Sequence, residues 1–197
     1  MLTLFLSLVL GCSVSNKQSS ETGIQQAQEQ GEVFDPASVE PGIQAGDCVQ
    51  FLGERPCDIV LKDQNGEYFR LYDHEGEVIL LDFSAGWCGP CKAAARTVQE
   101  TQDRYDEYGF LYVTVMVEDD GANSTTQSFA NQWAHSYGIE TPPVLQGSRE
   151  LIDYEGITGY NVTGWPTFYV IDREMKLDSA LRGFNEEWIK FHIEQLL

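Results

Sequence analysis

Residues 83–95 read FSAGWCGPCKAAA and place Cys88 and Cys91 on either side of a Gly-Pro pair. Two cysteines at this spacing occur in metal sites, in structural disulfides and in redox centres. The apolar run 78–83 comes before them and three alanines follow, a pattern that predicts a buried strand leading into a helix. The cysteines are therefore expected where a central strand ends and a helix begins.

The start of a helix favours a thiolate over a thiol, because its N–H groups are unpaired and carry partial positive charge. Pro90 is tolerated in a first helical turn, where an N–H would have no partner. Lowering a thiol pKa from about 8.5 to about 7 requires only about 2 kcal/mol and makes about half of it thiolate at neutral pH. We expect Cys88, nearer the exposed end, to be the nucleophile and Cys91 the resolving thiol.

The rest of the domain alternates between strand and helix patterns. Strands are expected at 58–62, 68–72, 78–83, 110–117, 167–171 and 176–181, and helices at 93–108, 124–137 and 186–197. The first two strands flank an Asn-Gly turn and should form a hairpin. Phe129, Trp133 and Tyr137 recur at four-residue spacing, which favours core packing. Together these patterns predict an α/β fold.

The first twelve residues have the pattern of an export signal. Their apolar run, residues 2–10, is too short to span a bilayer and has the length of a signal-peptide core, although no Lys or Arg precedes it. Residues 9–12, Val-Leu-Gly-Cys, resemble the lipobox of bacterial lipoproteins. This resemblance implies cleavage before Cys12 and lipidation of Cys12. The alternative is an ordinary signal peptide with a chance cysteine.

Residues 13–46 are rich in Gln, Ser, Glu and Gly, with few large apolar side chains. Such a segment cannot bury enough apolar surface to offset its ordering entropy, so we expect a flexible tether followed by one domain over 47–197. The whole chain has 12 basic and 31 acidic side chains, a net charge of −19. That balance argues against a nucleic-acid partner and is typical of a self-repelling soluble surface, or of one that steers basic partners.

If the protein is exported to an oxidising compartment, the number of its cysteines, five, indicates which of them can form disulfides. If Cys12 is lipidated and Cys88 pairs with Cys91, then Cys48 and Cys57 remain as a second pair. A structural disulfide between them would stabilise the fold by about 2.5–3 kcal/mol in the chain-entropy model. This pairing rests on counting alone.

Residues 82–92, DFSAGWCGPCK, resemble the active-site segment of thioredoxin, and residues 160–167, YNVTGWPT, resemble the segment that contains the cis-proline of that family. Two motifs far apart are more specific than one cysteine pair. An extra helix–strand unit at 124–160 is similar to the membrane-anchored thioredoxin-like proteins of bacteria. The resemblance covers about 58–197. It implies a thioredoxin-like fold with a central mixed sheet flanked by helices, an N-terminal hairpin and this inserted unit.

The resemblance also implies roles for single residues. Asp82 matches the buried carboxylate that accepts a proton near the resolving cysteine, and an acid in an apolar strand should have a raised pKa. A surface-facing Asp82 is the alternative. Pro166 matches the cis-proline that faces the cysteine pair. Trp87 would shield the disulfide, with simple core packing as the alternative.

The resemblance also indicates which residues next to the cysteines should contact a substrate. These are Trp87, Gly89, Pro90 and Trp165. Trp165 is a departure, because thioredoxin has a small aliphatic residue there and many anchored relatives have threonine. The redox potential and the choice of partner therefore cannot be copied from the family. The lysine that accompanies the buried Asp in thioredoxin is also missing from 110–117.

The function implied by the resemblance is thiol–disulfide exchange with exported proteins through a redox-active Cys88–Cys91 disulfide, with no other cofactor. The Gly-Pro pair between the cysteines resembles reducing thioredoxins, which favours a disulfide reductase supplied by a membrane electron donor. An oxidase or isomerase is the alternative. The protein would act outside the cytoplasm, held by its lipid anchor at the periplasmic face of a bacterial membrane.

Three other functions fit the sequence less well. A structural zinc site needs about four ligands, and His74, His135 and His192 lack ligand spacing, so no metal is expected. A binding module with a purely structural disulfide would have a reduction potential of about −300 mV or below. A peroxidase relative would need a lone peroxidatic cysteine rather than a close pair.

Overall fold

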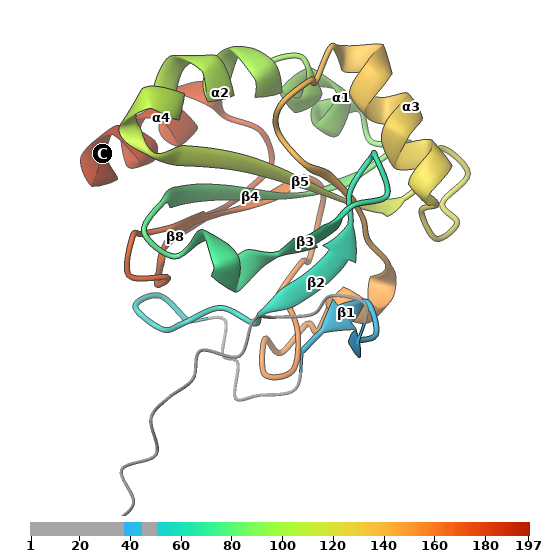
Figure 1. Cartoon of the computed structure of the whole chain (residues 1–197), viewed down its shortest axis with the longest axis horizontal. Coiled ribbons are helices and arrows are strands. Elements are labelled where there is room, and N and C mark those ends of the chain that lie inside the picture. The colour runs from blue at the N-terminus through green and yellow to red at the C-terminus, as the bar shows by residue number, and fades with distance from the viewer. Residues whose placement is uncertain (1–37, 45–50) are drawn as a thin grey trace, which may run out of the picture. The chain divides into compact units, whose positions relative to one another are not determined.

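The computed structural model describes residues 38–44 and 51–197, which belong to one compact unit, Asp35–Leu197 (Figure 1). Residues 1–37 and 45–50 lie outside the described residues. The signal peptide, the lipidation of Cys12 and the position of Cys48 therefore stay predictions.

The main sheet has five strands: β4 (Val78–Ala85), β5 (Phe110–Glu118), β6 (Val144–Gln146), β7 (Thr167–Ile171) and β8 (Leu177–Arg182). Their order across the sheet is β6-β5-β4-β7-β8. β4 runs parallel to β5 and antiparallel to β7, which makes the sheet mixed. All eight residues of β4 are buried, as its continuous apolar sequence predicts for a central strand.

Four helices accompany this sheet: α1 (Gly89–Ala95), α2 (Val98–Tyr105), α3 (Gln127–Tyr137) and α4 (Glu186–Leu196). The 3-10 turns within residues 51–197 are η2 (Leu71–His74), η3 (Asp106–Tyr108) and η4 (Arg149–Leu151). The single helix predicted for 93–108 is broken between α1 and α2, where Thr97 Oγ1 donates to the carbonyl of Ala94 and competes with the helical bonds. α3 begins later than predicted because Thr126 caps it, accepting from Phe129 N–H at 3.2 Å.

A second sheet of three antiparallel strands contains β1 (Gly42–Ile43), β2 (Ile59–Lys62) and β3 (Tyr68–Arg70). β2 and β3 form the predicted hairpin, and their turn is held by Asp63, whose carboxylate accepts from the N–H groups of Asn65 and Glu67. β3 is shorter than predicted, because the chain turns into η2 at Leu71. In Figure 1 this sheet and the four helices lie on opposite sides of β4 and β5.

The position of β1 shows that the predicted flexible tether extends too far toward the domain. Gly42 and Ile43 fall within 13–46, yet they pair with Val60 and Ile59 of β2. Ile43 packs against the buried cluster beneath the hairpin, and this apolar contact helps to hold β1 in place.

β4 separates two buried clusters, because successive side chains of a strand point to opposite faces. Val78 and Leu80 pack with the helices and with both active-site cysteines. Ile79, Leu81 and Phe83 pack with the hairpin. The predicted α/β fold with a central mixed sheet, a hairpin and an inserted helix–strand unit is confirmed. Among the helices of residues 38–44 and 51–197, none has the length and apolarity needed to cross a membrane.

Candidate active site

Cys88 and Cys91 are joined by a disulfide at the start of α1, with their Cα atoms 5.2 Å apart. Cys88 caps the helix, since its Sγ accepts a hydrogen bond from Cys91 N–H at 3.1 Å. A donor aimed at this sulfur favours the thiolate once the bond is reduced. Trp87, Gly89 and Pro90 are exposed around it. Cys88 retains 4% exposure, whereas Cys91 has none, so a partner reaches Cys88 first.

Asp82 is buried in β4 and has two neutral hydrogen-bond donors. Ser84 Oγ donates to its Oδ1 at 2.8 Å, and Tyr112 Oη donates to its Oδ2 at 3.4 Å. Burial raises the pKa of Asp82 to about 7, and these two hydrogen bonds partly oppose that rise. The surface-facing alternative is wrong. As an even-numbered residue of β4, Asp82 lies on the face of the sheet that carries the two cysteines.

Tyr112 was not foreseen from the sequence. The segment 110–117 lacks a basic residue, and the structure shows that a tyrosine of this segment contacts the acid instead. The contact depends on the parallel register, in which Asp82 lies opposite Thr114, two residues along from Tyr112 on the same face. Without knowledge of that register, a tyrosine in an apolar strand does not indicate which residue of the neighbouring strand it contacts.

The Trp165–Pro166 peptide bond is cis, as the resemblance implies. β7 starts at Thr167 opposite Phe83 of β4, so Pro166 lies beside the end of β4 that leads into Cys88. Trp165 packs against the buried cluster that includes both cysteines. The two motifs recognised in the sequence therefore meet at one end of the sheet.

Trp87 is not a core residue, since 46% of its surface is exposed. Its indole Nε1 donates to Glu118 Oε2 at 2.8 Å. Glu118 ends β5 and is 1% exposed, and its other oxygen accepts from Arg149 of η4. A buried carboxylate thus fixes the tryptophan beside the disulfide and ties it to the inserted segment. Glu118 and Arg149 were not foreseen, although Glu118, like Asp82, is an acid in an otherwise apolar strand sequence.

Gly86 brings the loop after β5 against the active-site turn. A Cβ at this position would lie 2.6 Å from Phe129 Cζ and 2.8 Å from the backbone N of Asp120, so only glycine fits. Lys92, directly after Cys91, forms an ion pair of 3.2 Å with Asp120. The turn that carries the cysteines is therefore held from the side by this loop.

The second cysteine pair is described only in part. Cys57 is fully buried and disulfide-bonded, but Cys48 lies outside the described residues, so the Cys48–Cys57 pairing stays a prediction. In the described part of the chain, no group of three or more His, Cys, Asp or Glu side chains is placed to hold a metal ion.

Comparisons with known proteins agree with this geometry. The AhpC/TSA family model matches residues 52–180. The thiol-disulfide oxidoreductase ResA of Geobacillus thermodenitrificans (strain NG80-2) is 27% identical over 146 residues, which cover 74% of this chain and 78% of that protein. The exposed lipoprotein thioredoxin Etrx1 of Streptococcus pneumoniae TIGR4 superposes with a TM-score of 0.57 at 27% identity, over 71% of this chain and 99% of that one. A thioredoxin-family thiol:disulfide interchange protein of Chlorobium tepidum TLS gives 0.58 at 19% identity, over 81% and 99%, which supports the fold alone.

Proposed function

Because this chain belongs to the AhpC/TSA family and has a thioredoxin-like fold, we propose that it is a thiol-disulfide oxidoreductase acting through Cys88 and Cys91. The observation that carries the proposal is the Cys88–Cys91 disulfide at a helix start, on the sheet face that holds the buried acid Asp82. The name of the relative ResA supports the same chemistry.

In the reductive direction, the Cys88 thiolate attacks one sulfur of a client disulfide. A Cys88–client bond forms, and the second client sulfur leaves as a thiolate. Cys91 gives its proton to Asp82 and attacks Cys88 Sγ, which releases the first client sulfur as a thiolate. Two electrons have then passed to the client, and the Cys88–Cys91 bond has formed again. A dithiol electron donor, which we place in the membrane, must reduce it before the next cycle.

We favour net reduction of exported proteins, because Gly89 and Pro90 separate the cysteines as in reducing thioredoxins. Equilibration of the Cys88–Cys91 pair with glutathione or dithiothreitol buffers tests the direction. A potential near that of thioredoxin, about −270 mV, supports a reductase, and one near about −120 mV supports an oxidase.

Location outside the cytoplasm is part of the proposal and rests on two supports. Residues 9–12 resemble a lipobox, and the similar protein Etrx1 is a lipoprotein. The test is the mass of the mature N-terminal peptide together with fractionation of a Cys12→Ala variant. Acylation of Cys12, and release of the variant from membranes, would support lipid anchoring, whereas an unmodified and uncleaved Cys12 would contradict it.

Trapping of clients tests the chemistry directly. A Cys91→Ser variant can attack a client but cannot resolve the mixed disulfide, so clients should remain linked to Cys88. A Cys88→Ser variant is the matched control and should trap none. Mixed disulfides through residue 91 in that control would reverse the assigned roles.

A further inference from the structure

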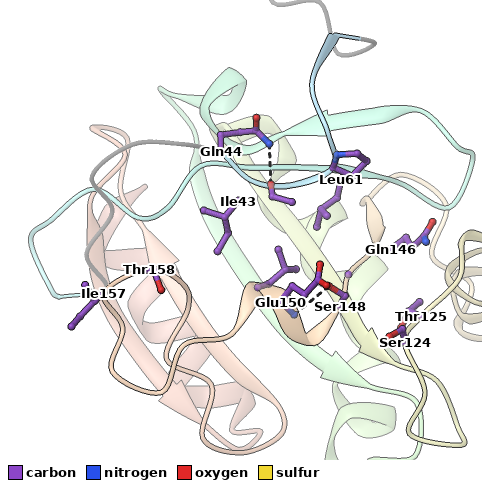
Figure 2. Close-up of a pocket in the computed structure, with 14 residues that line it drawn as sticks. Ile43, Gln44, Leu61, Ser124, Thr125, Gln146, Ser148, Glu150, Ile157 and Thr158 are labelled. Carbon is purple, nitrogen blue, oxygen red and sulfur yellow. Dashed lines mark hydrogen bonds between the residues drawn. The ribbon is translucent and has the colours of Figure 1, made fainter.

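A cavity of about 620 Å³ lies between the N-terminal hairpin sheet and the inserted segment. In Figure 2, Ser124 and Thr125 lie at one end of it, Ile157 and Thr158 lie at the other, and Ser148 and Glu150 of the η4 region lie between. Its volume is within the range of ligand sites in proteins, about 300–1,000 Å³. Neither cysteine of the redox pair lines it.

The lining offers hydrogen bonds and apolar contacts but almost no charge. Thr125 is 3% exposed, and its hydroxyl has no hydrogen-bond partner within the described residues. A buried hydroxyl without a partner is costly, so a ligand that supplies one would gain free energy. Leu61 and Leu151 provide apolar surface, and the only charged lining residue in the described ranges is Glu150. The lining therefore suits an uncharged ligand with alternating polar and apolar groups.

The three-stranded sheet presents its edge strand, β1, to this cavity. Gln44 N–H donates to the carbonyl of Asp58, the residue before β2. Because backbone groups of an antiparallel strand alternate in direction, the N–H and C=O of Ile43 point to the other edge of β1. Gly42 and Ile43 line the cavity. An extended peptide could therefore bond to this edge in the manner of an added strand.

The cavity is also connected to the active-site tryptophan. Arg149 lies between Ser148 and Glu150, two lining residues, and it binds Glu118, which accepts from Trp87. At the other side, Ser124 forms an isolated bridge with Glu118. Two partners of Glu118, Arg149 and Ser124, therefore lie in or next to the lining of the cavity.

We infer that this cavity binds an extended, uncharged segment of the client polypeptide while the client's disulfide reacts at Cys88. The inference rests on the proposed function and adds a second contact site to it. An acidic segment would meet Glu150 and a chain of net charge −19, so clients with neutral rather than acidic segments beside their cysteines should be preferred.

The experiment uses the full chain and a cavity-filling variant, Gln146→Trp. Gln146 lines the cavity from β6. The matched control is Gln195→Trp at an exposed position of α4, and Ile157→Glu at the far end of the cavity is a second variant. The probe is a fluorescent, cysteine-free peptide of alternating leucine and threonine, and its anisotropy reports binding without redox chemistry.

We expect Gln146→Trp and Ile157→Glu to weaken peptide binding by at least about tenfold, and Gln195→Trp to change it by less than about twofold. For the same peptide carrying a terminal disulfide, kcat/KM should fall in parallel, while reduction of 2-hydroxyethyl disulfide should stay constant. Equal peptide binding by Gln146→Trp and Gln195→Trp would overturn the inference. A wild-type protein that binds the peptide but reduces neither disulfide would instead contradict the proposed function and leave the cavity assignment intact.

Discussion

Two buried carboxylates on neighbouring strands of the main sheet, Asp82 and Glu118, have different hydrogen-bond partners. Asp82 and Glu118 are each 1% exposed, and they belong to the paired strands β4 and β5. Asp82 accepts hydrogen bonds from two neutral hydroxyls, those of Ser84 and Tyr112. Glu118 accepts from a guanidinium and an indole, those of Arg149 and Trp87.

The difference shows how partners decide the use of a buried acid. A carboxylate surrounded by neutral groups can exist with or without its proton near neutral pH, and burial raises the pKa of Asp82 to about 7. A carboxylate paired with a cation serves as a fixed anchor for its donors. We therefore assign proton transfer to Asp82 and the positioning of Trp87 to Glu118.

The largest effect expected from this contrast is on stability. The pKa of Asp82 is raised from 3.8 to about 7, so between these values the folded state holds a proton that the unfolded state releases. The contribution of Asp82 to stability therefore falls as pH rises from about 4 to about 7 and stays low above. As pH rises across that range, the free energy of unfolding of Asp82→Asn should increase by about 4 kcal/mol relative to that of the wild type. Denaturant unfolding of both proteins at pH 4 and pH 8 measures this difference. A difference independent of pH would contradict the assignment.

The next effect is on the resolving step. Asp82→Asn should slow release of the mixed disulfide by about 100-fold, since Cys91 loses its proton acceptor. In the wild type, the rate should rise with pH through about 7, where Asp82 becomes an acceptor, and this inflection should vanish in the variant. Stopped-flow measurement of the release rate provides the test. Glu118→Gln is the matched control, and it should keep the inflection.

A smaller effect is expected at Glu118. Arg149→Met removes the cation and leaves a buried carboxylate with a weaker set of donors. Because the Arg149 side chain is 59% exposed, the loss in free energy of unfolding should be only about 1–2 kcal/mol. In a double-mutant cycle, Glu118→Gln should relieve most of that loss. Strict additivity of the two changes would show that the pair does not couple.

The smallest effect concerns the donor Ser84. Ser84→Ala should raise the pKa of Asp82 further, because it removes a hydrogen bond that favours the charged form. The rate inflection should move to higher pH. Ser179→Ala is the matched control, since Ser179 is a buried serine whose hydroxyl has no partner within the described residues. A shift of equal size in both variants would exclude a specific role for Ser84.

Local sequence was sufficient where one element and one motif determine the structure. The apolar run before Cys88, the Asn-Gly turn and the alanines after Cys91 each specify their own conformation, and the positions of Asp82 and Pro166 followed from recognised motifs. A strand of only two residues, Gly42 and Ile43, is too short to show the alternation of apolar and polar residues that predicts a strand, so β1 could not be predicted. Its pairing depends on the hairpin that folds against it.

The contacts of the two acids could not be predicted for a different reason. Tyr112 reaches Asp82 only because β4 and β5 pair in one register, and Arg149 reaches Glu118 only because the inserted segment folds back over the end of β5. Each contact joins residues about thirty positions apart, as sequence separations of 30 and 31 show. Contacts between residues so far apart in the sequence leave no pattern in the local sequence from which they could be predicted.

The position of β4 between β5 and β7 links the chemistry to the order in which the chain is made. The cysteines and β5 emerge first, and β7 follows only after the whole inserted segment. Until Phe168 takes its place opposite Asp82, one edge of β4 is open and water reaches the acid, which returns its pKa towards the ordinary value. A chain whose last strands have not yet paired therefore has both cysteines but lacks the buried acid that we assign to the resolving step.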